Sequence, residues 1–331
     1  YILNFMEFPM AQTANEVTAR SAIPPLIHRT ALWRRILNAR YLYLLLLVPF
    51  VYVVIFNYIP IYGVLMAFKR FQPRLGIWGS PWVGFYNFQR FFTSPNFVNI
   101  LRNTLVLSIY GLIAGFPFPI LLAICINHSI NRHFKKFTQS VTFAPFFLSS
   151  VIMVTLITQV LGMRTGGVNI LLSALGREEI NFMASPALFT HIYIWSGIWQ
   201  GTGYSAIIYI SALAAVDPTL HEAAVIDGAS LWQRVWYIDL TTIRPIIVIL
   251  LILSMGSILG ANFEKAYLMQ NPLNITASEL ISTYVYKIGV ASARPDYSFG
   301  TAIGLFQNMV GIVLMLTVNK IANILTGEGM F

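Results

Sequence analysis

Charged residues are scarce in this chain, and acidic residues are scarcer than basic ones. Among 331 residues only 12 are Asp or Glu, charged residues total 10%, and hydrophobic residues reach 57%. Soluble globular domains carry about 25% charged residues, so this composition excludes an ordinary soluble domain. The single cysteine, Cys125, excludes an intrachain disulfide. We therefore expect an integral membrane protein.

Six apolar segments are each long enough to cross roughly 30 Å of hydrocarbon as a helix of about 20 residues. They are residues 41–61, 103–126, 138–161, 187–215, 242–262 and 299–321. None contains Asp or Glu, and their only basic residues, Arg244 and Lys320, lie near span ends. We predict an all-α integral membrane protein with a transmembrane domain over 41–325, preceded by an N-terminal arm over 1–40 and followed by a tail over 326–331.

Basic residues lie before the first predicted span and between the second and third. Five arginines precede residue 41, and the loop 127–137 has three basic residues and no acidic one. The positive-inside rule therefore places the N-terminus, this loop and the segment 216–241 in the cytoplasm. We expect a multi-pass protein of the bacterial cytoplasmic (inner) membrane.

The opposite face is basic as well. On this orientation it has ten Lys or Arg residues and five acidic ones, a net charge of +5, against +4 inside. Such a field would attract an anionic substrate to the outer mouth, where Lys69, Arg70 and Arg74 would favour uronate oligomers. Long loops escape the charge rule, however, so the same residues would equally suit an acidic partner protein or lipid headgroups. Both interpretations stay open.

Motifs for catalysis and metal binding are missing. The chain has no Gly-x-x-x-x-Gly-Lys-Ser/Thr loop for nucleotide phosphates, and His221-Glu222 lacks the second histidine of a zinc-protease motif. We expect no catalytic residue, no metal and no nucleic-acid partner. The spans also lack the mid-membrane acidic groups that a proton- or sodium-driven carrier uses. If this protein transports a solute, we expect the free energy to come from another subunit.

A short polar segment separates the fourth and fifth predicted spans. Asp217 is a good N-cap and Pro218 suits the first helical position, which predicts a helix to about Ile226. Gly228 permits a positive φ that ends this helix with a bend. The sequence from Ser230 to Gln233 has capping-box spacing and starts a second helix. The first helix is typical either of a surface that another protein holds or of an amphipathic helix resting on lipid.

The same segment carries a spaced motif made of Glu222-Ala223-Ala224, Gly228, Ile238, Leu240 and Pro245. This motif resembles the cytoplasmic signature loop of ABC-importer permease subunits, except that the family usually ends the loop with adjacent Leu-Pro. Other motifs are Trp82-x-Gly84-x-x-Asn87-Phe88, Asn103-Thr104, and Gly300 with Phe306-Gln307. They resemble the oligosaccharide branch of that family, the polysaccharide-type and maltose-permease-like subunits. The chain also resembles the first permease subunit of a bacterial alginate-oligosaccharide importer.

The resemblance implies a type I ABC-importer permease with six transmembrane helices and a cytoplasmic coupling helix that docks on a separate ATPase. The residues it assigns to ATPase coupling are Asp217, Glu222, Ala223, Ala224, Asp227 and Gly228. It implies no cofactor on this chain, with ATP and Mg²⁺ bound by the partner ATPase. The implied partners are a second homologous permease subunit, two ATPase subunits, an extracytoplasmic substrate-binding protein and an oligosaccharide, which the basic outer face suggests is acidic.

Aromatic and amide side chains crowd the fourth predicted span and suit the apolar faces and hydroxyls of sugar rings. The candidate substrate-path residues are Tyr193, Trp195, Trp199, Gln200 and Tyr204, with Asn262 and Asn308 as alternatives near span ends. The opposing interpretation is that these rings only pack against neighbouring helices, as most buried aromatics do.

Two other functions compete with an ATP-driven importer. An ATP-independent secondary carrier or channel for a small solute is disfavoured because the spans lack acidic residues. A membrane enzyme acting on lipid-linked sugars would need clustered catalytic acids near one face. The only such cluster comprises Asp217, Glu222, Asp227 and Asp239, which we attribute to helix capping and partner docking.

Overall fold

The structure is a computed structural model that describes residues 39–256, 258–260 and 262–326. It divides into two units, Tyr1–Tyr62 and Gly63–Phe331. Nearly all of the predicted N-terminal arm, and the tail beyond residue 326, lie outside the described residues. In the described part, four helices are long and apolar enough to span a membrane, and two bent helix pairs bring the total to six if each pair is one span.

The first unit consists of α2 (Arg40–Val53), the π-helical turn η1 (Val54–Tyr58) and the start of the 3₁₀ helix η2 (Ile59–Phe68). With the rest of η2, which belongs to the second unit, they make one apolar span, Arg40–Phe68, of 29 residues, longer than the 21 residues predicted. The change of helix type precedes Pro60, which has no N–H to donate to the preceding turn. Nearly all of the large side chains from Tyr41 to Ile61 are exposed, as a lipid-facing helix requires.

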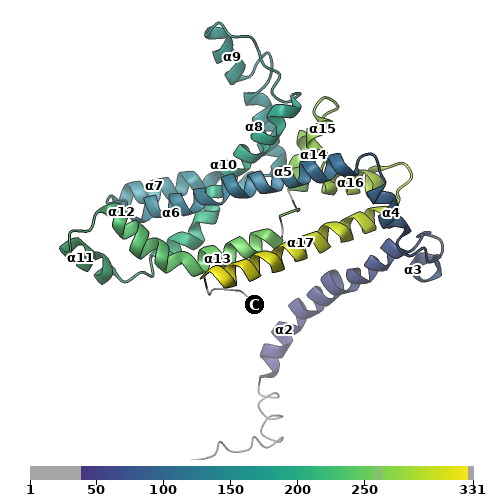
Figure 1. Cartoon of the computed structure of the whole chain (residues 1–331), viewed down its shortest axis with the longest axis horizontal. Coiled ribbons are helices and arrows are strands. Elements are labelled where there is room, and N and C mark those ends of the chain that lie inside the picture. Colours follow the sequence, from purple (N-terminus) through teal and green to yellow (C-terminus); the bar gives the residue numbers. More distant parts are fainter. Residues whose placement is uncertain (1–38, 257, 261, 327–331) are drawn as a thin grey trace, which may run out of the picture. The chain divides into compact units, whose positions relative to one another are not determined.

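The long helices of the second unit form two neighbouring sets (Figure 1). One set is α5 (Phe97–Gly115) and α6 (Pro117–Asn127), which run end to end against α10 (Pro186–Leu213). The other is α13 (Leu240–Gly256), which packs against α17 (Tyr297–Thr326). α10 contacts both sets and so lies at the centre of the unit.

The segment predicted as the third span is not one straight helix. It consists of α7 (Arg132–Phe143), η3 (Ala144–Phe147) and α8 (Ser150–Val160), with a bend of 101° before α8. Leu148 is extended at the bend, and Ser149 caps α8 by accepting from the backbone N–H of Ile152. The carbonyl of Leu148, freed by the bend, accepts a hydrogen bond of 2.9 Å from Gln200 on α10.

The fifth span begins earlier than predicted. α12 (Leu231–Arg234), the π-helical turn η4 (Val235–Asp239) and α13 form one continuous helix of 26 residues. Pro245 therefore lies inside the helix. The second helix of the polar segment and the fifth span are one rigid element.

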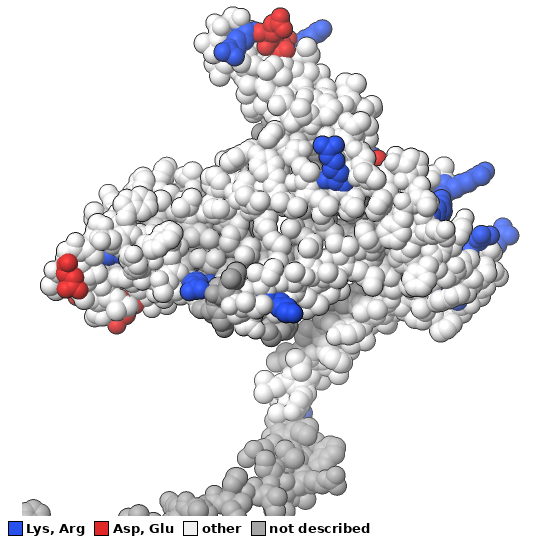
Figure 2. All heavy atoms as spheres, viewed as in Figure 1, with Lys and Arg blue, Asp and Glu red and all other residues white. Residues whose placement is uncertain are grey.

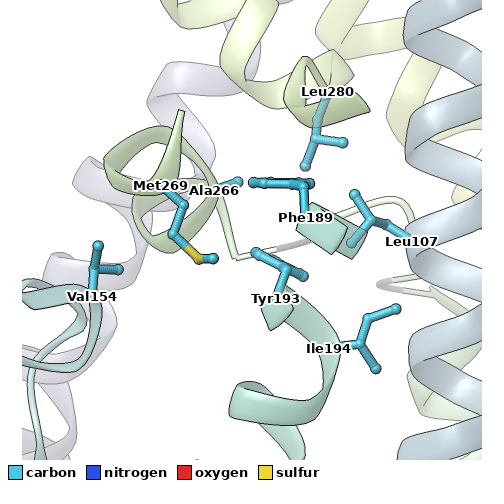
Figure 3. Packing of buried hydrophobic residues seen from close by; sticks show 8 residues of the cluster. All are labelled: Leu107, Val154, Phe189, Tyr193, Ile194, Ala266, Met269 and Leu280. Atoms are coloured by element: carbon cyan, nitrogen blue, oxygen red, sulfur yellow. The ribbon is translucent and has the colours of Figure 1, made fainter. Parts of the chain in front are cut away.

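Short helices complete the second unit around a core beside α10. They are α3 (Gly76–Gly79), α4 (Tyr86–Phe92), α9 (Gly167–Ala174), α14 (Phe263–Met269), α15 (Ile275–Ser278), α16 (Ile281–Tyr286) and the π-helical turn η5 (Lys287–Ala291). Figure 3 shows side chains from α5, α8, α10 and α14 meeting in this core, with Phe189 and Tyr193 stacked at its centre. The core fixes α14 against α10, which sets the geometry of the cavity described below.

Several residues of the oligosaccharide-branch motifs hold the chain's loops. Asn87, which is buried, donates to the carbonyls of Ala67 and Lys69 at 2.8 and 3.2 Å. The hydroxyl of Thr104 accepts from the backbone N–H of Ile281 at 3.0 Å, and Gln307 donates to the carbonyl of Leu259 at 2.7 Å. These motif residues thus stabilise the fold.

Candidate functional site

The polar segment forms a capped helix, α11 (Pro218–Ile226), as its sequence predicts. The carboxylate of Asp217 accepts from the backbone N–H of Thr219 at 2.9 Å, and this hydrogen bond lowers the pKa of Asp217. At the other end Gly228 has φ of 80°, and Ala229 N–H donates to the carbonyl of Ala224 at 2.8 Å. This is the Schellman arrangement, and it gives α11 two firmly defined ends.

The surface of α11 is exposed and mixes acidic with apolar side chains. Glu222 and Ala223 are exposed, and Ile226 is 85% exposed. Trp232, on the following helix, is likewise exposed. Figure 2 shows acidic side chains gathered at the end of the second unit that carries α11, and basic ones at the opposite end near α3 and α4. Large apolar side chains exposed beside charged ones are typical of a protein-binding surface.

A buried carboxylate lies between two histidines beneath α11. Asp239 is 0% exposed, and its Oδ2 lies 2.6 Å from Nε2 of His128, just past the end of α6. Its Oδ1 lies 3.3 Å from Nε2 of His221 on α11. We call His128, Asp239 and His221 the carboxylate clamp. It joins α11 to the end of α6 and to the first turns of the fifth span.

The carboxylate clamp corrects one interpretation of the sequence. Asp239 had been grouped with the capping and docking acids, but a fully buried carboxylate neither caps α11 nor reaches a partner. The signal for its role is that Asp239 is the only charged residue between Arg234 and Arg244 and lies between the apolar residues Ile238 and Leu240. A buried charge in such a helix needs a partner, and histidine is a suitable one.

A cavity of about 510 Å³ lies beside the centre of α10. Its walls come from α5, α6 and α10 and from the residues before and within α14. Three candidate path residues line it: Tyr193, Gln200 and Asn262. Each also makes a structural contact, because Tyr193 donates to the carbonyl of Asn262, Gln200 donates to Leu148, and the Asn262 side chain caps α14.

The other four candidate path residues lie elsewhere. Trp195 and Trp199 are about half exposed on α10, and Trp195 donates to the hydroxyl of Tyr110 at 3.0 Å. Tyr204 stacks on Phe146 with ring centroids 3.8 Å apart. Asn308 lines a separate cavity of about 360 Å³ beside α16 and α17.

Arginines line a third cavity, of about 390 Å³, near α4 and the start of α17. Arg90 pairs with Asp296 at 2.6 Å, whereas Arg70 and Arg294 form no ion pair with any described residue. Lys69, expected to act with Arg70 on an anionic substrate, donates to the carbonyls of Ile77 and Trp78 at 2.8 and 3.2 Å and does not line this cavity. The free positive charge of this cavity therefore comes from the arginines.

Within the described ranges, no group of three or more His, Cys, Asp or Glu side chains is placed to hold a metal ion. In the carboxylate clamp, Oδ2 of Asp239 is hydrogen-bonded to His128, whereas Oδ1 lies within ion-pair distance of His221 without a hydrogen bond.

Two proteins of Bacillus subtilis (strain 168) are each 41% identical to the chain. One is the protein LplB, matched over 292 residues that cover 88% of this chain and 91% of LplB. The other is the polygalacturonan/rhamnogalacturonan transport system permease protein YteP, matched over 303 residues that cover 92% and 94%. No protein-family model matches the chain.

Solved structures agree with these relatives. A chain in the crystal structure of a bacterial ABC transporter involved in the import of the acidic polysaccharide alginate is 38% identical, with a TM-score of 0.81 over 89% of this chain and 99% of that chain. The crystal structure of a bacterial alginate ABC transporter in complex with an alginate pentasaccharide-bound periplasmic protein contains a chain 36% identical, with a TM-score of 0.82 over 90% and 99%. The likeness therefore extends over nearly the full length of both chains.

Proposed function

The chain belongs to the permease subunits of ABC sugar transporters, and from this we propose that it forms half of the membrane path of an oligosaccharide importer whose ATP and Mg²⁺ are bound by separate ATPase subunits. The observation that carries the proposal is the exposed, doubly capped helix α11. A short rigid helix with an exposed acidic and apolar surface is suited to docking in a groove of another protein.

The coupling role follows from how α11 is held. Glu222 would contact a basic group of the ATPase, and Ala223 and Ala224 would let the backbone approach closely. Asp217, Asp227 and Gly228 fix the ends of the helix. The carboxylate clamp then passes a push on α11 to α6 and to the fifth span, because Asp239 lies in the continuous helix Leu231–Gly256.

We further propose that the substrate is acidic and is delivered by an extracytoplasmic binding protein. Both solved structures concern alginate, one of them with a periplasmic protein, and YteP is named for polygalacturonan and rhamnogalacturonan, which contain uronic acids. The unpaired Arg70 and Arg294 add positive charge to the cavity near α4 and the start of α17, and Figure 2 shows basic side chains at the end of the second unit opposite α11. A second, similar permease and two ATPase subunits would complete the complex, with the N-terminus of this chain in the cytoplasm.

The test is uptake by the complete complex reconstituted in liposomes. We expect ATP-dependent uptake of uronate oligosaccharides that requires the ATPase subunits and the binding protein. The uptake assay compares acidic with neutral oligosaccharides of equal length. Uptake by this chain alone, without ATP, would refute the proposal and support the channel or secondary-carrier alternative.

A further inference from the structure

The cavity beside α10 contains two buried polar groups that the fold leaves short of partners. Lys265, on α14 between the last two spans, is 3% exposed, and its Nζ donates one hydrogen bond, of 2.9 Å, to the carbonyl of Tyr193. Ser108, on α5, is 9% exposed, and its hydroxyl has no hydrogen-bond partner. Both residues line the same cavity. Buried polar groups are normally satisfied, so two such groups on one cavity indicate a polar ligand.

The ammonium charge of Lys265 is not balanced by any described residue. Four ion pairs form among the described residues, and Lys265 takes part in none of them. Its other favourable contact is the face of the Tyr193 ring, whose centroid lies 5.0 Å from Nζ. An ammonium has three donors, and only one is used here. A buried cation with unused donors is suited to an anion that comes from outside the chain.

The backbone keeps space beside this ammonium. A Cβ atom built on Gly197 would lie 3.3 Å from Nζ of Lys265, and Gly197 also lines the cavity. Any larger residue at 197 would crowd the charge. The cavity volume, about 510 Å³, falls in the range of roughly 300–1,000 Å³ that is common for small-molecule sites.

We propose that Lys265 and Ser108 form a subsite for one uronic acid unit of the transported oligosaccharide. The ammonium of Lys265 pairs with the sugar carboxylate, and the hydroxyl of Ser108 bonds to a hydroxyl of the same sugar. The inference rests on the proposed transport function and deepens it, because it names the residue that distinguishes acidic from neutral sugars within the membrane path. The arginine cavity near α4 is a separate site.

The experiment compares a uronate trisaccharide with the methyl ester of the same trisaccharide, using ATPase stimulation of the complete reconstituted complex. Lys265→Gln removes the charge but keeps an N–H donor for the Tyr193 carbonyl. We expect it to weaken the apparent affinity for the acid about tenfold and to change that for the ester less than about twofold. Lys265→Arg should retain the preference for the acid. Arg177→Gln, which removes an exposed cation outside the cavity, is the matched control and should behave as wild type.

Ser108→Ala locates the subsite independently. Removing a hydroxyl that has no protein partner should not harm folding, so this variant decides the location even if Lys265→Gln prevents assembly. We expect a loss of affinity of a few fold for acid and ester alike, and an unchanged affinity would overturn the assignment to this cavity. If Lys265→Gln changed the apparent affinities for the acid and the ester equally, only the role of Lys265 would be overturned. Wild-type complex that responds to neither probe would instead contradict the proposed function.

Discussion

Helix α11 is held at its ends by its own neighbours in the sequence, whereas the cavity beside α10 is assembled from residues far apart in the chain. Asp217 and Gly228 adjoin the helix that they cap, and Glu222 remains exposed between them. In the cavity, by contrast, Lys265 meets Tyr193, 72 positions away. The outer surface of α11 is suited to a protein partner, and the cavity is suited to a small polar ligand. Local changes should therefore affect the two regions in different ways.

The largest effect is expected for Glu222→Lys. If an ATPase subunit places a basic group opposite Glu222, the reversed charge creates a like-charge contact that costs several kcal/mol, so coupling of ATP hydrolysis to uptake should fall by about 100-fold or more. The side chain is exposed, so thermal stability of the isolated chain should not change. The measurement is the ratio of sugar imported to ATP hydrolysed. Normal coupling in this variant would contradict docking of α11 on an ATPase and would support the alternative that α11 is an amphipathic helix resting on lipid.

Asp239→Asn tests whether α11 is also held from beneath. Removing a buried charge from the carboxylate clamp should lower the free energy of unfolding by about 1.5–3 kcal/mol, the usual contribution of a hydrogen bond to a charged group. Uptake per ATP should fall as well, because the push on α11 no longer reaches the fifth span. Asp296→Asn is the matched control, since its ion pair with Arg90 is partly exposed and should contribute less than about 1 kcal/mol. Equal effects of the two variants would contradict the clamp.

The same contrast explains how far the sequence could predict this protein. The bounds and both caps of α11 are confirmed, because Asp217, Pro218 and Gly228 act through hydrogen bonds to adjacent residues. Membership of the ABC permease family is confirmed by the relatives. The lengths of the apolar segments predict where the membrane spans lie, but they do not predict where the spans bend. The bend before α8 is held by Gln200, which is 52 positions from Leu148.

The missed residues share a physical reason. His128 and Asp239 are 111 positions apart, and no local sequence pattern at either residue predicts its contact with the other. Lys265 follows directly on Glu264 and reads as a solvated loop residue, whereas packing of α14 against α10 buries it. Periodicity identifies which segments are helices. It does not identify which polar side chains the helices enclose when they pack.

The pH dependence of sugar selection tests the cavity side of the comparison. Burial lowers the pKa of Lys265 to about 8 from its usual 10.5, so the cation is present at pH 7 and is lost as the pH rises through 8. Tyr193, on α10, is the titratable group in contact with it, and Glu264 is its exposed neighbour on α14. Preference for the acid over its ester should fall about tenfold between pH 7 and 9. In Lys265→Arg it should stay constant.

The lowered pKa also has a consequence for stability. Because the folded state holds this proton less tightly than the unfolded state, Lys265 costs stability below pH 8, and the cost disappears as the pH rises from 8 towards 10.5. The melting temperature of the complex without sugar should therefore contain a contribution from Lys265 that increases as the pH rises from 8 towards 10.5. The Lys265→Gln variant should lack this contribution. A bound uronate should oppose the trend, since its carboxylate stabilises the protonated amine.

The smallest effect separates the two regions most directly, because one substitution should act in opposite directions. Gly228→Ala places a side chain at φ of 80°, which costs about 1–2 kcal/mol although a Cβ there would meet no atom within 4 Å. Gly201→Ala, in α10 beside the cavity, also meets nothing within 4 Å, but its helical backbone favours alanine by up to about 1 kcal/mol. Chemical denaturation should show Gly228→Ala less stable and Gly201→Ala equally or more stable than wild type. A stabilising Gly228→Ala would mean that α11 does not end in the left-handed turn on which its rigid docking depends.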